Sequence, residues 1–209
     1  MALLKTITCV AFIAACCQHG VLGQGYHSQR FKYDGTDAKI IWALTTADSI
    51  YNIPAFWQKV REYPQQKIAN SSYTMAMLAD ALQNTPCAVA VIMSSGTHSS
   101  TAQTGRDEKT HNLRISLNNS GYQEDRKALA VTFIHEWVHA IDYTLNENTP
   151  LKFAHFSGGF FSYLNEKGGR CKSQDTAAYR IERVADIQFG WPDYVLDLLN
   201  CRYRPEFAN

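Results

Sequence analysis

The pattern of apolar and polar positions predicts both strands and helices along the chain. Short apolar runs at residues 39–45 (KIIWALT) and 87–93 (CAVAVIM) are typical of strands, and we expect the second to lie centrally in a sheet. Alternation of apolar and polar residues over 113–117 (LRISL) predicts a half-exposed strand. The segment 94–109 is rich in Ser, Thr and Gly, which predicts a loop.

Apolar residues at helical spacing predict the remaining elements. These are helices over about 54–62, 73–83, 124–145, 175–189 and 193–199. Ser72 is placed to cap the second of them, and Gly190 with Pro192 ends the fourth. The segment 150–173 is aromatic and Gly-rich, which predicts irregular structure. Strands and helices are mixed and helices dominate the second half, so we expect an α+β fold with a small mixed sheet.

Length and composition indicate how many domains the chain forms and which classes of partner it is expected to bind. The chain has 209 residues, of which 45% are hydrophobic and 19% charged, which suits one compact domain over residues 24–209. Net charge is +1, with 20 Lys and Arg against 19 Asp and Glu. This balance gives no reason to expect nucleic acid or an anionic membrane as a partner.

The first residues have the order of a secretory signal peptide. Lys5 precedes an apolar stretch at 7–17, and residues 21–23 (VLG) precede a cleavage site at Gln24. We therefore expect a signal peptide over 1–23 and a secreted, extracellular protein. An alternative is a lipoprotein anchored through Cys16, because residues 13–16 (IAAC) resemble a bacterial lipobox.

Three cysteines remain after removal of the signal, namely Cys87, Cys171 and Cys201. An odd number allows one disulfide and one free thiol in an exported protein. Cys171 and Cys201 flank the C-terminal helical region, so we predict a disulfide bond between them.

The strongest chemical motif is His135-Glu136-Trp137-Val138-His139 (HExxH), within the predicted long helix. Histidines four residues apart lie one turn apart on the same helix face, so both imidazoles can converge on one metal ion. Glu136 is offset around the helix and can reach a water molecule beside the metal. The motif predicts a zinc (Zn2+) site with His135 and His139 as ligands and Glu136 as the catalytic general base.

The other residues of this predicted helix indicate that one of its faces is packed and the other is open to a cleft. His135, His139 and Asp142 share a face at 3.6 residues per turn. The opposite face carries large apolar residues: Ala130, Phe133, Ile134, Trp137 and Ile141.

A third metal ligand is predicted on the helix at 175–189. Glu182 falls on the apolar stripe of that helix, while Arg180 and Arg183 are expected to point away from the stripe. A carboxylate on an apolar stripe is costly unless a partner compensates it, and zinc is such a partner. Asp186, one turn later, is placed to accept a hydrogen bond from a ligand histidine. The alternative role of Glu182 is a salt bridge with a helix arginine.

HExxH followed by ExxxD on a later helix resembles the gluzincin group of zinc peptidases, including its bacterial toxin-like members. The resemblance covers about residues 113–189 and implies a zincin-like fold. It implies that Glu136 is the general base, Glu182 the third ligand and Asp186 the partner of the first histidine.

Other candidates for the site remain open. Asp142, His155 and Glu166 are alternatives for the third ligand. Tyr163, Tyr179 and His155 are candidates for stabilising the oxyanion. The strand at 113–117 is a candidate for binding an extended peptide by strand addition.

The sequence therefore predicts a secreted zinc metalloendopeptidase that hydrolyses protein or peptide substrates. One alternative is a catalytically inactive zincin-fold protein that acts as a binding or toxin-like module. Another is a zinc hydrolase of non-peptide amides, because the same residues serve that reaction.

Overall fold

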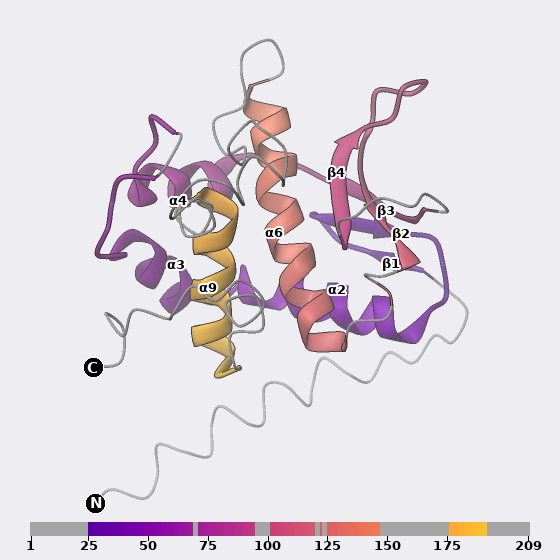
Figure 1. Ribbon diagram of the computed structural model, residues 1–209, viewed down its shortest axis with the longest axis horizontal. Helices are drawn as coiled ribbons and strands as arrows, with labels where there is room; N and C mark the ends of the chain where they lie inside the picture. Colours follow the sequence, from indigo (N-terminus) through magenta and orange to yellow (C-terminus); the bar gives the residue numbers. More distant parts are fainter. Residues whose placement is uncertain are drawn as a thin grey trace, which may run out of the picture.

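The computed structural model describes residues 25–68, 71–94, 101–119, 122, 125–146 and 176–191. These residues form a mixed sheet beside a group of helices, so the predicted α+β class is confirmed (Figure 1). The strands are β1 (Tyr26–His27), β2 (Phe31–Tyr33), β3 (Val89–Met93), β4 (Ala102–Arg106) and β5 (Leu113–Leu117). The helices are α2 (Ala38–Ile50), α3 (Pro54–Arg61), α4 (Met75–Asn84), α6 (Arg126–Leu145) and α9 (Ala177–Phe189).

The five strands are ordered β1-β2-β3-β5-β4. β2, β3 and β5 are parallel, whereas β1 and β4 pair antiparallel at the two edges. The predicted central strand is confirmed as β3, and the predicted strand at 113–117 is confirmed as β5. However, β5 pairs with β3 on one side and β4 on the other, so its expected role as an edge strand for a peptide is wrong.

The edge position belongs to β4, which lies in a segment predicted to be a loop. Its residues (AQTGR) have little apolar content, and only Ala102 and Thr104 are buried. β4 pairs with β5 at all of its five residues. Backbone hydrogen bonds to a neighbour, rather than an apolar pattern, make this segment a strand.

The predicted strand at 39–45 is also wrong, because these residues lie within helix α2. The Asp37 side chain caps this helix by accepting hydrogen bonds from the backbone N–H groups of Lys39 and Ile40. The buried residues of α2 recur at helical spacing: Ile40, Ala43, Leu44, Ala47 and Ile50. A window of seven residues was too short to distinguish this period from a buried strand.

The other helices agree with the sequence, with small changes at their starts. Thr74, rather than Ser72, caps α4 by accepting a hydrogen bond from the Met77 backbone N–H. Asp125 caps α6. Gly190 ends α9 as predicted, with a φ of 66° that favours glycine.

Several predictions fall on residues that the structure does not describe. These are the signal peptide at 1–23, Cys16, the segment 150–173, the helix at 193–199, and the Cys171–Cys201 disulfide. Among the described residues, Cys87 is a buried free thiol. Within the same residues, the helices are too short or too polar to cross a membrane.

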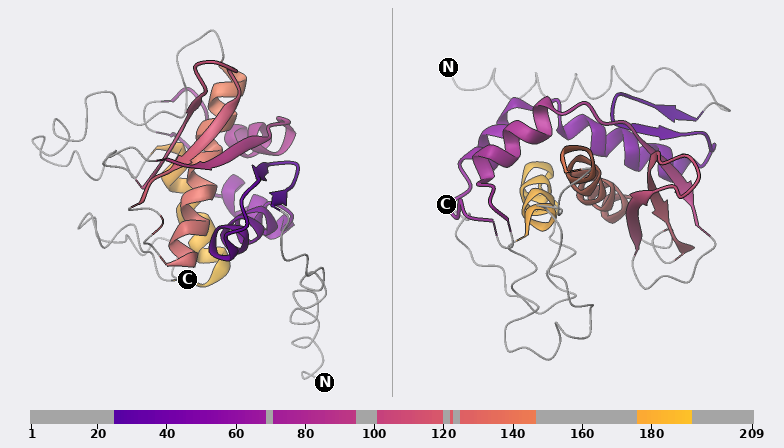
Figure 2. Two further views of the ribbon diagram at one scale, coloured as in Figure 1. Left: turned by 90° about the vertical axis from the view of Figure 1, so that its right-hand side faces the viewer. Right: turned by 90° about the horizontal axis from the view of Figure 1, so that it is seen from above.

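Helix α6 lies at the centre of the helical layer. It contacts β4 and β5 on one side and α9 on the other, and it also packs against α2 (Figures 1 and 2). The face predicted to be packed is confirmed, because Phe133, Ile134 and Trp137 are almost fully buried. On the opposite face α9 packs against α6, and His135 is only 9% exposed whereas His139 is partly exposed.

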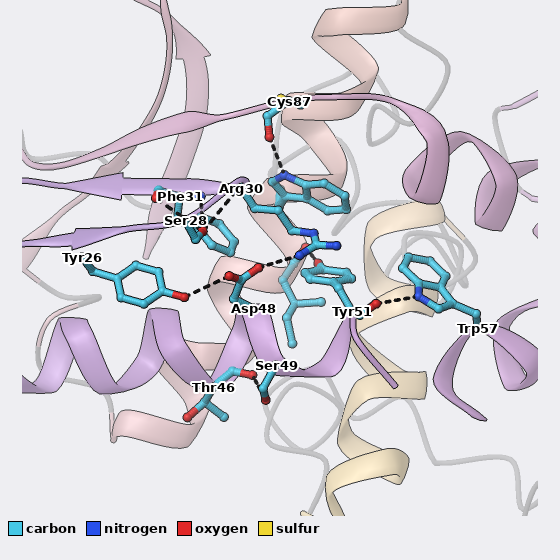
Figure 3. Close-up of polar contacts among 12 residues, drawn as sticks. Tyr26, Ser28, Arg30, Phe31, Thr46, Asp48, Ser49, Tyr51, Trp57 and Cys87 are labelled. Atoms are coloured by element: carbon cyan, nitrogen blue, oxygen red, sulfur yellow. Dashed lines mark hydrogen bonds and ion pairs between the residues drawn. The ribbon is translucent and has the colours of Figure 1, made fainter. Parts of the chain in front are cut away.

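A group of polar and aromatic residues fixes the packed side of α6 (Figure 3). Arg30 donates a hydrogen bond to Asp48 at 2.8 Å, and Tyr26 donates one to the other oxygen of Asp48 at 2.9 Å. The Arg30 guanidinium also lies 5.0 Å from the Tyr51 ring centroid and 5.6 Å from that of Trp137. These contacts join β1 and the turn before β2 to α2 and α6.

Candidate metal centre

The two histidines of the motif lie side by side on α6. Their ring centroids are 5.1 Å apart, with the ring planes inclined at 66°. His135 is buried and His139 is partly buried. The structure therefore brings together the two imidazoles that the spacing predicted on one face.

Helix α9 packs against this face and contributes a carboxylate. The Nδ1 atom of His135 donates a hydrogen bond to Oε2 of Glu182 over 2.9 Å, and both side chains are buried. Glu182 was predicted from its place on the apolar stripe of its helix. The structure joins it to the first histidine of the motif across 47 residues of sequence.

The Glu182 carboxylate changes the protonation of the histidine. Burial acts to lower the pKa of His135, but the hydrogen bond and charge of Glu182, with the charge of Glu136, raise that pKa above its ordinary value. A histidine with a raised pKa carries a proton that competes with a metal ion.

Arg180 was expected to point away from the apolar stripe, and the side of α9 on which it lies is also buried. Arg180 is 0% exposed, donates to the carbonyl of Gln65, and lies 5.1 Å from the Tyr63 ring centroid. Arg183 donates to the Tyr63 hydroxyl at 3.1 Å. Helix α9 therefore packs on a second side, against α3 and the residues that follow it.

Glu136 has a partner that the sequence did not reveal. The Thr104 hydroxyl on β4 lies 2.6 Å from Oε2 of Glu136 and 2.8 Å from its backbone carbonyl oxygen. Both residues are buried, at 8% and 7% exposed for Glu136 and Thr104. Thr104 lay in the predicted loop, and only a prediction of the β4–β5 pairing would have placed it beside α6.

The remaining candidates are distributed around this group. Asp186 is buried one turn beyond Glu182 on α9. The Tyr179 ring packs edge-on against His135, with centroids 4.7 Å apart, so Tyr179 is the oxyanion candidate beside the motif among the described residues. Asp142 is buried and accepts a hydrogen bond from Asn146 at 2.7 Å, which suits a role at the helix end. His155, Tyr163 and Glu166 lie outside the described residues.

The donor types at this site suit zinc, although no site is fully assembled among the described residues. Within those ranges, no group of three or more His, Cys, Asp or Glu side chains is arranged to hold a metal ion. His135, His139 and Glu182 would supply imidazole nitrogens and a carboxylate oxygen, which are donors that zinc takes in proteins.

Comparison of the chain with protein-family models, characterised proteins and solved structures finds no match.

Proposed function

We propose that the chain is a secreted zinc-dependent peptidase with its active site on α6. The observation that carries the proposal is the buried contact between Glu182 on α9 and His135 of the HExxH motif. A buried carboxylate is costly without a compensating charge, and a zinc ion shared by Glu182 and the motif histidines would supply one. Export is proposed because residues 1–23 have the predicted order of a signal peptide, and the proposed fold is a zincin-like version of the observed α+β arrangement.

In this proposal His135, His139 and Glu182 hold the zinc ion. When bound, zinc polarises the scissile carbonyl and lowers the pKa of a water molecule to about 7. Glu136 accepts a proton from the attacking water as the new C–O bond forms. It then returns the proton to the amide nitrogen as the C–N bond breaks, so the carboxylate is regenerated. Asp186 is proposed to support a ligand histidine, and Tyr179 to donate to the developing oxyanion.

The edge strand β4 supports a peptide as the substrate. Among the described residues β4 pairs only with β5, so we propose that the main-chain groups on its other side receive an added strand. β4 also contacts α6 through Thr104 and Glu136, which places this edge beside the motif. An extended peptide bound along β4 would therefore lie close to the proposed base.

The test is the substitution Glu136→Gln, which removes the proton acceptor and keeps the size of the side chain. We expect the purified variant to retain zinc and thermal stability and to lose most hydrolysis of a quenched fluorescent casein. Glu62→Gln, which changes an exposed carboxylate at the end of α3, is the matched control. Hydrolysis by Glu136→Gln at the parent rate would show that Glu136 is not the base.

If the parent binds zinc but cleaves no peptide, the peptidase proposal fails. Hydrolysis of small amide substrates by that protein would then favour an amide hydrolase.

A further inference from the structure

We propose that Thr104 is a positioning residue for Glu136, a role that rests on the proposed function of Glu136 as the proton acceptor. The Thr104 hydroxyl reaches two oxygens of the same residue, the carboxylate Oε2 at 2.6 Å and the backbone carbonyl at 2.8 Å. A contact that spans the backbone and the tip of one side chain restricts the rotamers of that side chain.

The chemistry of the contact favours the carboxylate as the acceptor. A hydroxyl has one proton and can donate it to only one acceptor at a time. A hydrogen bond to an ionised carboxylate is shorter and stronger than one to a neutral carbonyl. The distances follow this order, since the contact to Oε2 is the shorter of the two. With Oε2 held by Thr104, Oε1 is the oxygen left to accept a proton from water.

The buried position of Thr104 in the sheet also means that its hydroxyl requires a hydrogen-bond partner. It faces inward on β4 together with Ala102, and it is paired with Ile115, a fully buried residue of β5. A buried hydroxyl without a hydrogen bond costs about 1–3 kcal/mol. An apolar residue would fill this position at no such cost, and Glu136 is the group that makes a hydroxyl useful here.

Because Thr104 lies on β4, it is also close to the proposed binding site of the peptide substrate. The same edge strand is proposed to receive the peptide, and Gln103 beside Thr104 is exposed. A peptide added to β4 would lie along the strand that carries Thr104, whose hydroxyl contacts the carboxylate of Glu136. Thr104 thus acts on catalysis through Glu136 and not by touching the reacting atoms.

The test compares Thr104→Val, which keeps the shape and removes the hydroxyl, with Thr104→Ser, which keeps the hydroxyl. For cleavage of the quenched casein, we expect Thr104→Val to lower kcat by about tenfold to a hundredfold, as a misplaced catalytic group does. KM and zinc content should stay close to parent values, and Thr104→Ser should recover most of kcat. An equal kcat in Thr104→Val and the parent would overturn the proposal, and so would a failure of serine to restore activity.

Thr144→Val is the matched control. Its hydroxyl donates to the Ala140 carbonyl on the same helix at 2.9 Å, without contact to Glu136. We expect parent-like kcat from this variant. A loss in Thr144→Val as large as that in Thr104→Val would show that any hydroxyl beside α6 has this effect, and would overturn a specific role for Thr104.

A measurement without substrate separates this proposal from the proposed function. Thr104→Val, Glu136→Ala and the double variant form a thermodynamic cycle in urea-induced unfolding of the metal-free protein. We expect the two sites to be coupled by about fivefold or more in the unfolding equilibrium constant, as a charge-assisted hydrogen bond requires. Coupling below about twofold would overturn the positioning role even in an active enzyme. Clear coupling in a chain that cleaves nothing would instead refute only the peptidase.

Discussion

Replacing Glu182 by Ala distinguishes the possible roles of the carboxylate that α9 brings to the motif. Zinc sites in small proteins bind with about 10–16 kcal/mol, so each of four ligands contributes roughly 3 kcal/mol or more. Loss of a direct ligand should therefore weaken zinc binding by about a hundredfold or more. If Glu182 is only a structural residue, zinc affinity should not change, although removing one partner of a buried pair costs about 3–5 kcal/mol of stability.

The variant Glu182→Gln distinguishes two roles of Glu182, namely binding the zinc ion and accepting a hydrogen bond from His135. The amide oxygen of glutamine accepts the Nδ1–H of His135 but is a weaker zinc ligand than a carboxylate. If Glu182 binds the metal, both variants should lose affinity. If Glu182 only orients His135, Glu182→Ala should lower the zinc affinity by about tenfold to a hundredfold, and Glu182→Gln should lower it much less.

The assay is competition for zinc against a chromophoric chelator at pH 8. This pH limits the contribution of protons on His135, whose raised pKa falls when Glu182 is removed. Glu62→Ala, on the far end of α3, is the control. Parent-like zinc affinity in Glu182→Ala would refute the reasoning and transfer the role of third ligand to His155, Glu166 or Asp142.

Three further predictions concern Asp186, the His135–Glu182 pair and Asp125. Asp186→Ala should weaken zinc binding by about tenfold to a hundredfold if Asp186 supports a ligand histidine, and the same chelator competition measures it. In metal-free protein, the raised pKa of His135 means that its pairing with Glu182 stabilises the fold below about pH 6.5 and less as pH rises through the raised value. Urea unfolding should therefore show a larger gap between parent and Glu182→Gln at pH 6 than at pH 9, and an equal gap would contradict the pairing. Asp125→Ala removes the cap of α6, whose carboxylate accepts from two backbone N–H groups, and should cost about 1 kcal/mol of stability.

The parts predictable from sequence were those that depend on local periodicity. His135, Glu136 and His139 could be placed on one helix because their spacing alone determines the face they share. Glu182 could be singled out because a carboxylate on an apolar stripe needs a partner. Its contact with His135 could not be derived, since it depends on how α9 packs against α6.

The errors arose where neighbouring elements decide the structure. β4 is a strand because β5 pairs with it, so its polar sequence carried little signal, and Thr104 was missed with it. Arg180 was expected to point away from the apolar stripe of its helix, and its burial against Tyr63 and Gln65 depends on packing that the local sequence does not reveal. The start of α2 was predicted as a strand because seven residues are too few to distinguish helical spacing of apolar residues from the apolar run of a buried strand.

The metal content of the purified chain tests the central claim most directly. Protein prepared without chelator and freed of loose metal by gel filtration should contain one zinc per chain by mass spectrometry of the metal. His135→Ala and His139→Ala should each lose that zinc, because two of the three proposed protein ligands are imidazoles on α6. A parent content near zero, with no uptake after zinc is added, would contradict a zinc enzyme at this site.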